Sequence, residues 1–423
     1  FEESGNTIRR ARVLRFPMCL VRLDHFQRMG RLIIHETLRD RGRLLFIDSQ
    51  QAAKRAKSTL CILFFSHQWL SSDMPDDTAH SQYKDMLSAA MQAQQLRGMN
   101  PENVFVWVDY CCVPQRNLDQ QQLAVESLSA YAAICSMFII SAPQALHTQT
   151  RTPCNFSTYS GRLWCRLEFF CKLIAGVFEH NHPRKSMGGT SNDGSVRSVH
   201  QRSGTGIYTV MQGILQPLQV TDGDGALRKE YRDMLRVFEG QVSCCAKGHP
   251  TRDGAPIVCD KIRLVESLTG VYGAMLLQAK KSARNPRRSD TPLSKCLLKT
   301  IIDDADVLFP LQLFDGRIQA MQQYVNMVDA DHNKDAQNLW NGVLTGGTES
   351  SVVRDSVHVP DFDSSGSEDD DDENSELMQA ERVALMDANG GEHGDEEDEE
   401  KEEYEEKQKE LEAKVTPILT KLY

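Results

Sequence analysis

The sequence predicts an α/β fold whose centre is a doubly wound parallel sheet between roughly residues 58 and 182. Three short apolar runs, rich in aromatic and β-branched residues, are typical of buried parallel strands. The segment after each run carries apolar residues at helical spacing. The strands are expected at 59–66, 103–110 and 136–142, and the helices at 81–97, 119–135 and 159–178. Strands that alternate with helices in this way indicate parallel pairing with helices on both faces.

The remaining regions differ in composition from this α/β domain. We expect a helical leader at 1–57, a flexible linker or insertion at 183–206, a strand at 207–219 that would extend the domain to about 220, a mostly helical region at 225–345, and a polar to acidic, largely disordered tail at 346–423. Because the chain begins at Phe1, we also expect it to be a fragment.

Charge is distributed very unevenly along the chain. Residues 361–412 hold 24 Asp and Glu against 4 Lys and Arg, a net of -20, so the rest carries -11 + 20 = +9. A basic body of this kind can bind nucleic acid or anionic lipid, but its basic residues form no dense stripe. We therefore expect the tail to solubilise the body, and nucleic acid is not indicated as a partner.

Cysteine usage and hydropathy indicate a cytoplasmic protein. The chain has no secretory signal and no apolar run of the roughly 18 residues that a membrane helix needs. Its 12 cysteines are too few in 423 residues for a disulfide scaffold, and reduced thiols are expected. No membrane span is predicted.

Polar residues follow each predicted strand, at the edge of the sheet where ligands of parallel sheets bind. Ser66 and His67 end the first strand, and Asp109 ends the second. Ser66 or His67 could bond the ribose or phosphate of a nucleotide, and Asp109 could bond ribose hydroxyls. The plainer interpretation is that these residues terminate strands and cap turns.

Three motifs fall in register on this predicted frame: FFSHQW at 64–69, VWVDYCCVPQ at 106–115 and RLWCRLE at 162–168. They resemble the opening strand and serine of TIR domains, the Ser-Tyr-x-Trp and Trp-Ile-Asp motifs of heterokaryon-incompatibility (HET) domains, and the tryptophan-to-glutamate helix motif of both families. The resemblance covers about 125 of 423 residues. His67 stands where the HET motif has Tyr, and Leu70 stands where it has Gly.

This resemblance implies a flavodoxin-like sheet and an intracellular signalling or defence function that involves self-association. It also implies that Glu168 cleaves the nicotinamide–ribose bond of NAD. NAD would be the substrate, and no cofactor is required. Nicotinamide leaves as a neutral molecule, so a single carboxylate that stabilises the cationic sugar is sufficient. The expected nucleotide-binding residues are Ser66, His67, Trp69, Asp109 and Trp164.

Trp164 lies four residues before Glu168, on the same helix face, where it could wall the nicotinamide site. Alternatively, Trp164 packs in the core and Glu168 is a surface acid paired with Arg162 or Arg166. In that case the domain is a non-enzymatic module that self-associates or recruits partners.

A third interpretation pairs His67 with Cys111 or Cys112 as a caspase-like peptidase dyad. The glycine expected after the histidine is absent, and this interpretation leaves RLWCRLE unexplained. Cys244, Cys245, His249 and Cys259 also lie close in sequence, but their spacing does not match a standard zinc knuckle. No metal site is therefore expected.

Overall fold

The structure is a computed structural model that describes residues 2–11, 13–179, 205–249, 251–252, 255–256, 258–284 and 291–330. These residues belong to one compact unit, Phe1–Gly347. Most of the expected linker at 183–206 and the whole expected tail at 346–423 lie outside the described residues. In the described part of the chain, no helix has the length and apolar character of a membrane span.

The described residues form a seven-stranded mixed sheet with the order β2-β1-β4-β3-β5-β8-β9. The strands are β1 (Met18–Arg22), β2 (Leu44–Ile47), β3 (Cys61–His67), β4 (Val104–Val108), β5 (Met137–Ser141), β8 (Ile207–Met211) and β9 (Ile214–Pro217). The four central strands β4, β3, β5 and β8 are parallel, and the outer strands are antiparallel to their neighbours. The predicted α/β class is therefore confirmed.

The centre of the sheet is buried on both faces, as the continuous apolar runs predict. All seven residues of β3 are buried. Phe64 on β3 lies opposite Trp107 on β4 and Phe138 on β5. Its ring stacks on both neighbours, with centroids 3.9 Å and 5.1 Å away. Aromatic stacking across three strands adds to the burial of apolar area and fixes the register of the parallel strands.

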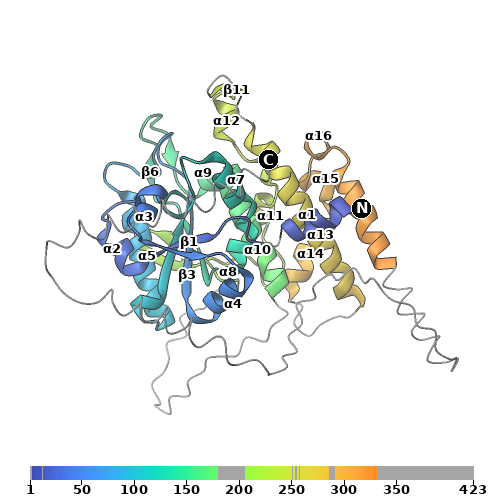
Figure 1. Cartoon of the computed structure of the whole chain (residues 1–423), viewed down its shortest axis with the longest axis horizontal. Coiled ribbons are helices and arrows are strands. Elements are labelled where there is room, and N and C mark those ends of the chain that lie inside the picture. Colours follow the sequence, from blue (N-terminus) through green and yellow to red (C-terminus); the bar gives the residue numbers. More distant parts are fainter. Residues whose placement is uncertain are drawn as a thin grey trace, which may run out of the picture. The chain divides into compact units, whose positions relative to one another are not determined.

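Helices cover both sides of the sheet. Figure 1 shows α5 (Ser81–Arg97) on one side, and α8 (Leu128–Ile134) and α10 (Leu163–Glu179) on the other. The expected helix at 119–135 is interrupted at Ser127, between α7 (Leu118–Glu126) and α8. The Ser127 hydroxyl accepts hydrogen bonds from the backbone N–H groups of Arg15 and Phe16. A contact between residues so far apart in the sequence cannot be predicted from a local sequence pattern.

The expectation of a helical leader at 1–57 was wrong in part. Strands β1 and β2 lie within it, and they extend the sheet beyond β4. These strands have only five and four residues. Apolar runs this short give a weak period-two signal beside the helical spacing of residues 23–40. The strand expected at 207–219 is the antiparallel hairpin of β8 and β9.

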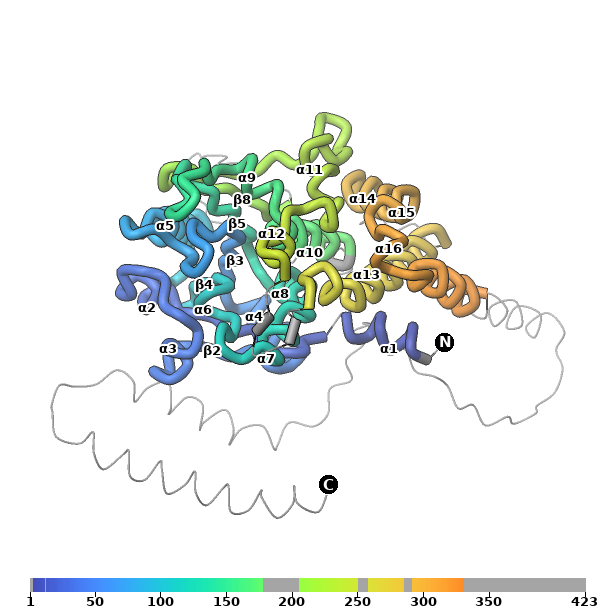
Figure 2. Tube along the Cα trace, turned by 90° about the horizontal axis from the view of Figure 1, so that it is seen from above, coloured from blue at the N-terminus to red at the C-terminus, as the bar shows by residue number. Residues whose placement is uncertain are grey.

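A helical layer packs beside α10, away from the sheet (Figures 1 and 2). It contains α1 (Glu2–Arg10), α13 (Asp260–Arg284), α14 (Pro292–Asp303) and a helix over residues 317–330. The shorter elements are α2 (Leu23–Arg28), α3 (His35–Asp40), α4 (Gln50–Thr59), α6 (Asp109–Cys112), α9 (Phe156–Ser160), α11 (Lys229–Met234), α12 (Ser243–Ala246), α15 (Ala305–Leu308), α16 (Leu311–Phe314), two 3-10 turns at Pro101–Asn103 and Val237–Glu239, and the two-residue strands β6 (Ala145–Leu146), β7 (Pro153–Cys154), β10 (Thr251–Arg252) and β11 (Ala255–Pro256).

Candidate functional site

Side chains from three elements meet at the carboxyl ends of the parallel strands. We call Ser66, His67, Trp69, Asp109 and Glu168 the strand-end cluster. Ser66 and His67 close β3, Trp69 follows it, Asp109 follows β4, and Glu168 comes from the second turn of α10. β4, the next strand of this sheet along the chain, pairs with one edge of β3, and β5 pairs with its other edge. The strand order therefore reverses at β3. Open α/β sheets bind ligands at this point.

Glu168 is buried, with 8% of its surface exposed. Its Oε2 accepts a hydrogen bond of 2.5 Å from the Ser66 hydroxyl. The hydroxyls of Ser66 and Tyr159 lie 2.7 Å apart. With the Ser66 proton directed at the carboxylate, Tyr159 is the donor to Ser66. The expected alternative of a surface acid is therefore wrong for Glu168, because its partner is a buried hydroxyl.

The two arginines that could have paired with Glu168 bind elsewhere. Arg166 donates to the backbone carbonyls of Ser160 and Arg236, and Arg162 donates to the hydroxyl of Ser243. Burial therefore raises the pKa of the Glu168 carboxyl well above its ordinary value. The negative charge of Asp109 raises it further, and the Ser66 hydrogen bond lowers it only in part. This environment disfavours the charged form of Glu168 relative to a carboxyl group in water.

His67 is held at both ring nitrogens. Its Nδ1 lies 3.0 Å from Oε1 of Gln82, and its Nε2 lies 2.7 Å from Oδ1 of Asp109. The Gln82 amide group donates to the carbonyls of Gln68 and Pro75, which fixes its oxygen toward His67. The ring is therefore fixed between Gln82 and Asp109, and His67 and Asp109 form a hydrogen-bonded pair.

Asp109 connects this pair to solvent. Its Oδ2 accepts from the Trp69 indole at 2.9 Å, and its Oδ1 also accepts from the backbone N–H of Tyr110 at 2.6 Å. Burial acts to raise the pKa of Asp109, but the charge and hydrogen bond of His67, with the Trp69 bond, hold the pKa below its ordinary value. The Asp109 side chain is 31% exposed, against 1% for His67. A ligand would therefore meet Asp109 before His67.

Trp164 does not bond to this cluster. Its indole donates to Asp260 at 3.1 Å, at the start of α13. Two residues that the sequence patterns did not single out belong to the site instead: Tyr159, which bonds Ser66, and Gln82, which orients His67. Gln82 is a polar residue on the helix expected at 81–97, and that helix was predicted from its apolar positions alone. Tyr159 lies on α9, at the first position of the helix expected at 159–178 and outside the three motifs.

The caspase-like interpretation lacks its dyad. Cys111 and Cys112 are buried, and burial raises the pKa of Cys111 to about 12 and that of Cys112 well above its ordinary value. Both ring nitrogens of His67 are taken by Gln82 and Asp109. A nucleophilic cysteine needs a lowered pKa and a neighbouring base, and this pair has neither.

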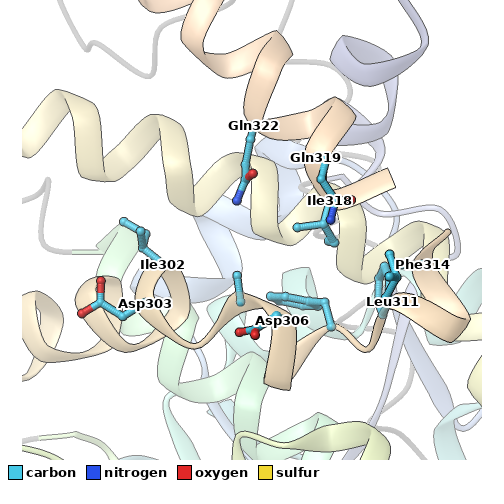
Figure 3. A pocket seen from close by; sticks show the side chains of 10 residues that line it. Ile302, Asp303, Asp306, Leu311, Phe314, Ile318, Gln319 and Gln322 are labelled. Carbon is cyan, nitrogen blue, oxygen red and sulfur yellow. The ribbon is translucent and has the colours of Figure 1, made fainter. Parts of the chain in front are cut away.

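A cavity of about 310 Å³ lies in the helical layer, between α14, α16 and the helix over residues 317–330. Figure 3 shows Gln322 and Ile318 above it and Asp306 below it, with Phe314 at the right and Asp303 at the left. No residue of the strand-end cluster lines this cavity. Its lining offers no nucleophile or base with an oriented partner, so we assign it no chemistry.

The strand-end cluster thus combines a buried carboxyl, Glu168, whose pKa is raised with a more open carboxylate, Asp109, whose pKa is lowered. Two acids whose pKa values are shifted in opposite directions by their environments are common in catalytic and binding sites. No family model, no curated protein and no solved structure matches this chain. The geometry of the site and the resemblance of its motifs therefore carry the functional argument.

Proposed function

We propose that the strand-end cluster binds a nucleotide of the NAD type and cleaves its nicotinamide–ribose bond, with Glu168 facing the sugar carbon. The observation that carries the proposal is the hydrogen bond between Ser66 and Glu168 beside Asp109. The parallel strand order β4-β3-β5-β8 supports a flavodoxin-like domain of the TIR/HET type, since it follows the order 2-1-3-4 of such sheets.

The reaction needs one anion near the sugar. As the bond from ribose C1′ to the nicotinamide nitrogen breaks, its electron pair leaves with the neutral base and positive charge develops on the sugar. The Glu168 carboxylate stabilises that charge, and water then adds to the sugar and loses a proton. The cationic nicotinamide ring also favours the ionised form of Glu168, which burial alone disfavours.

Asp109 would position the sugar. Its two oxygens already accept three hydrogen bonds, from His67, Trp69 and Tyr110. An ionised carboxylate offers about four acceptor sites, so roughly one is left for a ribose hydroxyl. Because its three donors fix the carboxylate, little reorganisation accompanies binding. Ser66 would keep the carboxylate of Glu168 aimed at the sugar.

The test is release of nicotinamide from NAD by the purified chain, measured by chromatography. We expect turnover in the wild type and a loss of about 10²–10³-fold in Glu168→Gln, since the glutamine keeps the shape but not the charge. Glu239→Gln, at an exposed glutamate, is the control. Thermal unfolding shows whether each variant is folded. No turnover by the wild type, even when it is forced to oligomerise, would refute the proposal.

A second candidate, a non-enzymatic module that self-associates, is favoured by the sheet edge. β2 pairs only with β1 in the described sheet, and two of its large apolar side chains, Leu45 and Phe46, are 39% and 47% exposed. An exposed apolar edge strand is a template for pairing with another chain. Sedimentation of Phe46→Lys tests this: concentration-dependent assembly of the wild type should be lost in Phe46→Lys and kept in Glu168→Gln.

A further inference from the structure

Three thiols and one imidazole converge beside the start of α13. Cys244 and Cys245 lie on α12, His249 lies in the turn after it, and Cys259 immediately precedes α13. Their ligand atoms all lie within 4.8 Å of one another. The sequence spacing predicted no metal site because the two cysteines are adjacent. The hairpin of β10 and β11 returns the chain after His249, which brings Cys259 to the same point.

Three of the six distances between these atoms match those of a tetrahedral metal site, and the others are at most 4.8 Å. Sγ of Cys259 lies 3.9 Å from Sγ of Cys244 and 3.6 Å from Sγ of Cys245, and Nε2 of His249 lies 3.5 Å from Sγ of Cys245. Zinc bonds of about 2.3 Å to sulfur and 2.0–2.1 Å to nitrogen separate tetrahedral ligands by roughly 3.8 Å for two sulfurs and 3.6 Å for sulfur and nitrogen. A disulfide would need sulfurs about 2.05 Å apart.

The backbone around these residues supports the same geometry. The N–H of Asp260 points at Sγ of Cys244, at 3.5 Å, as a second-shell donor to a metal thiolate does. Gly248 and His249 both have left-handed backbone angles, with φ of 68° and 52°. This turn, closed by the bond from the His249 N–H to the Cys244 carbonyl, folds the imidazole back over α12.

We propose that Cys244, Cys245, His249 and Cys259 bind one zinc ion as a structural site. Three thiolates and an imidazole are a soft donor set that selects zinc over magnesium or calcium. All four tetrahedral positions are filled by protein, which leaves no open position for water or substrate. The proposal does not depend on the function of Glu168.

The zinc ion would hold the start of α10 in place. The segment that carries the ligands bonds Trp164 of this helix and Arg162, which immediately precedes it. Ser243, next to Cys244, accepts from the Arg162 guanidinium at 3.3 Å, and Asp260, next to Cys259, accepts from the Trp164 indole at 3.1 Å. Glu168 lies one helical turn beyond Trp164. Loss of the metal would therefore loosen the helix that carries Glu168.

The metal content of the whole chain is the first measurement. The chain is purified without chelators, and zinc is measured by mass spectrometry. We expect about one zinc per chain in the wild type and in Cys296→Ser, at a cysteine outside the cluster. We expect Cys259→Ser to lose the metal. Full zinc content in folded Cys259→Ser, or no metal in the folded wild type after dialysis against zinc, would overturn the proposal.

Cobalt substitution keeps the test valid where a variant fails to fold. Co²⁺ replaces zinc in the wild type, and a tetrahedral site with three thiolates gives strong visible ligand-field bands and near-ultraviolet sulfur-to-metal charge-transfer bands. Their absence from a folded chain would contradict the site. Thiol alkylation followed by peptide mapping is a further test. A native disulfide between Cys245 and Cys259 would contradict the proposal, because it is incompatible with bound metal. A zinc chelator should lower the unfolding temperature of the wild type.

Discussion

The Ser66 hydroxyl at the end of β3 donates a hydrogen bond of 2.5 Å to the Glu168 carboxylate on α10. Both residues are buried, and they are 102 positions apart in the sequence. The bond joins the helix of the RLWCRLE motif to the strand of the FFSHQW motif. It therefore ties two segments that sequence resemblance singled out separately into one site.

Removal of the Ser66 hydroxyl should destabilise the fold. In Ser66→Ala, Glu168 and Tyr159 both lose the partner that the structure gives them, and a buried polar group without a partner costs about 1–3 kcal/mol. Urea unfolding at pH 7 measures the difference. Ser58→Ala, at an exposed helical serine, should change the free energy of unfolding by less than about 0.5 kcal/mol. Equal effects at the two positions would contradict the assigned role of Ser66.

The raised pKa of Glu168 predicts a pH dependence of stability. Its folded pKa lies well above the ordinary value of 4.5, so the protonated form stabilises the fold. That contribution is complete below about pH 4.5 and is lost as pH rises through the folded pKa. Glu168→Gln cannot ionise. Its stability relative to the wild type should therefore grow above pH 4.5 by about 1.4 kcal/mol per pH unit, until the folded pKa is reached.

Urea unfolding of wild type and Glu168→Gln in parallel, from pH 4 to pH 9, tests this slope. Titrating groups that do not interact with Glu168 act equally on both proteins, so their contributions cancel in the difference. A difference that does not change with pH would mean that Glu168 titrates normally and is hydrated in the folded protein.

The sequence predicted β3, β4 and β5 well because these strands are buried on both faces. Only a doubly covered strand tolerates a run such as Cys61–Phe65, in which no residue faces water. The strand ends followed from these runs, and so the meeting of His67 with Asp109 could be expected. The burial of Glu168 could not, because it depends on how α10 packs against β3, and no local pattern sets that angle.

Contacts between residues far apart in the sequence also could not be predicted. Tyr159 and Gln82 became part of the site through contacts made by the tertiary fold. The cysteine cluster shows the same limit. Adjacent Cys244 and Cys245 do not resemble a metal knuckle in sequence, and only the hairpin that returns Cys259 makes the group compact.

The hydrogen bonds around His67 predict a cost for removing its carboxylate partner. Nε2 of His67 lies 2.7 Å from Oδ1 of Asp109, and Nδ1 lies 3.0 Å from Oε1 of Gln82. Asp109→Asn should lower the free energy of unfolding by about 1.5 kcal/mol or more, because it removes a charged hydrogen bond. Urea unfolding at pH 7 measures the difference. An unchanged free energy of unfolding would exclude a stabilising role for the pair of His67 and Asp109.

The close contact between α1 and α13 makes its own prediction. A Cβ at Gly270 would lie 2.3 Å from the backbone oxygen of Thr7 and 2.7 Å from Cβ of Ala11, so the two helices approach too closely for any side chain there. Gly270→Ala must separate them, at a cost of about 1–3 kcal/mol. Gly176→Ala, on α10, is the matched control, because a Cβ there meets nothing within 4 Å. Alanine should stabilise that helix by roughly 0.5–1 kcal/mol. Changes of opposite sign in the free energy of unfolding, measured with urea, would confirm that α1 packs on α13. A stabilising Gly270→Ala would show that the leader does not pack there.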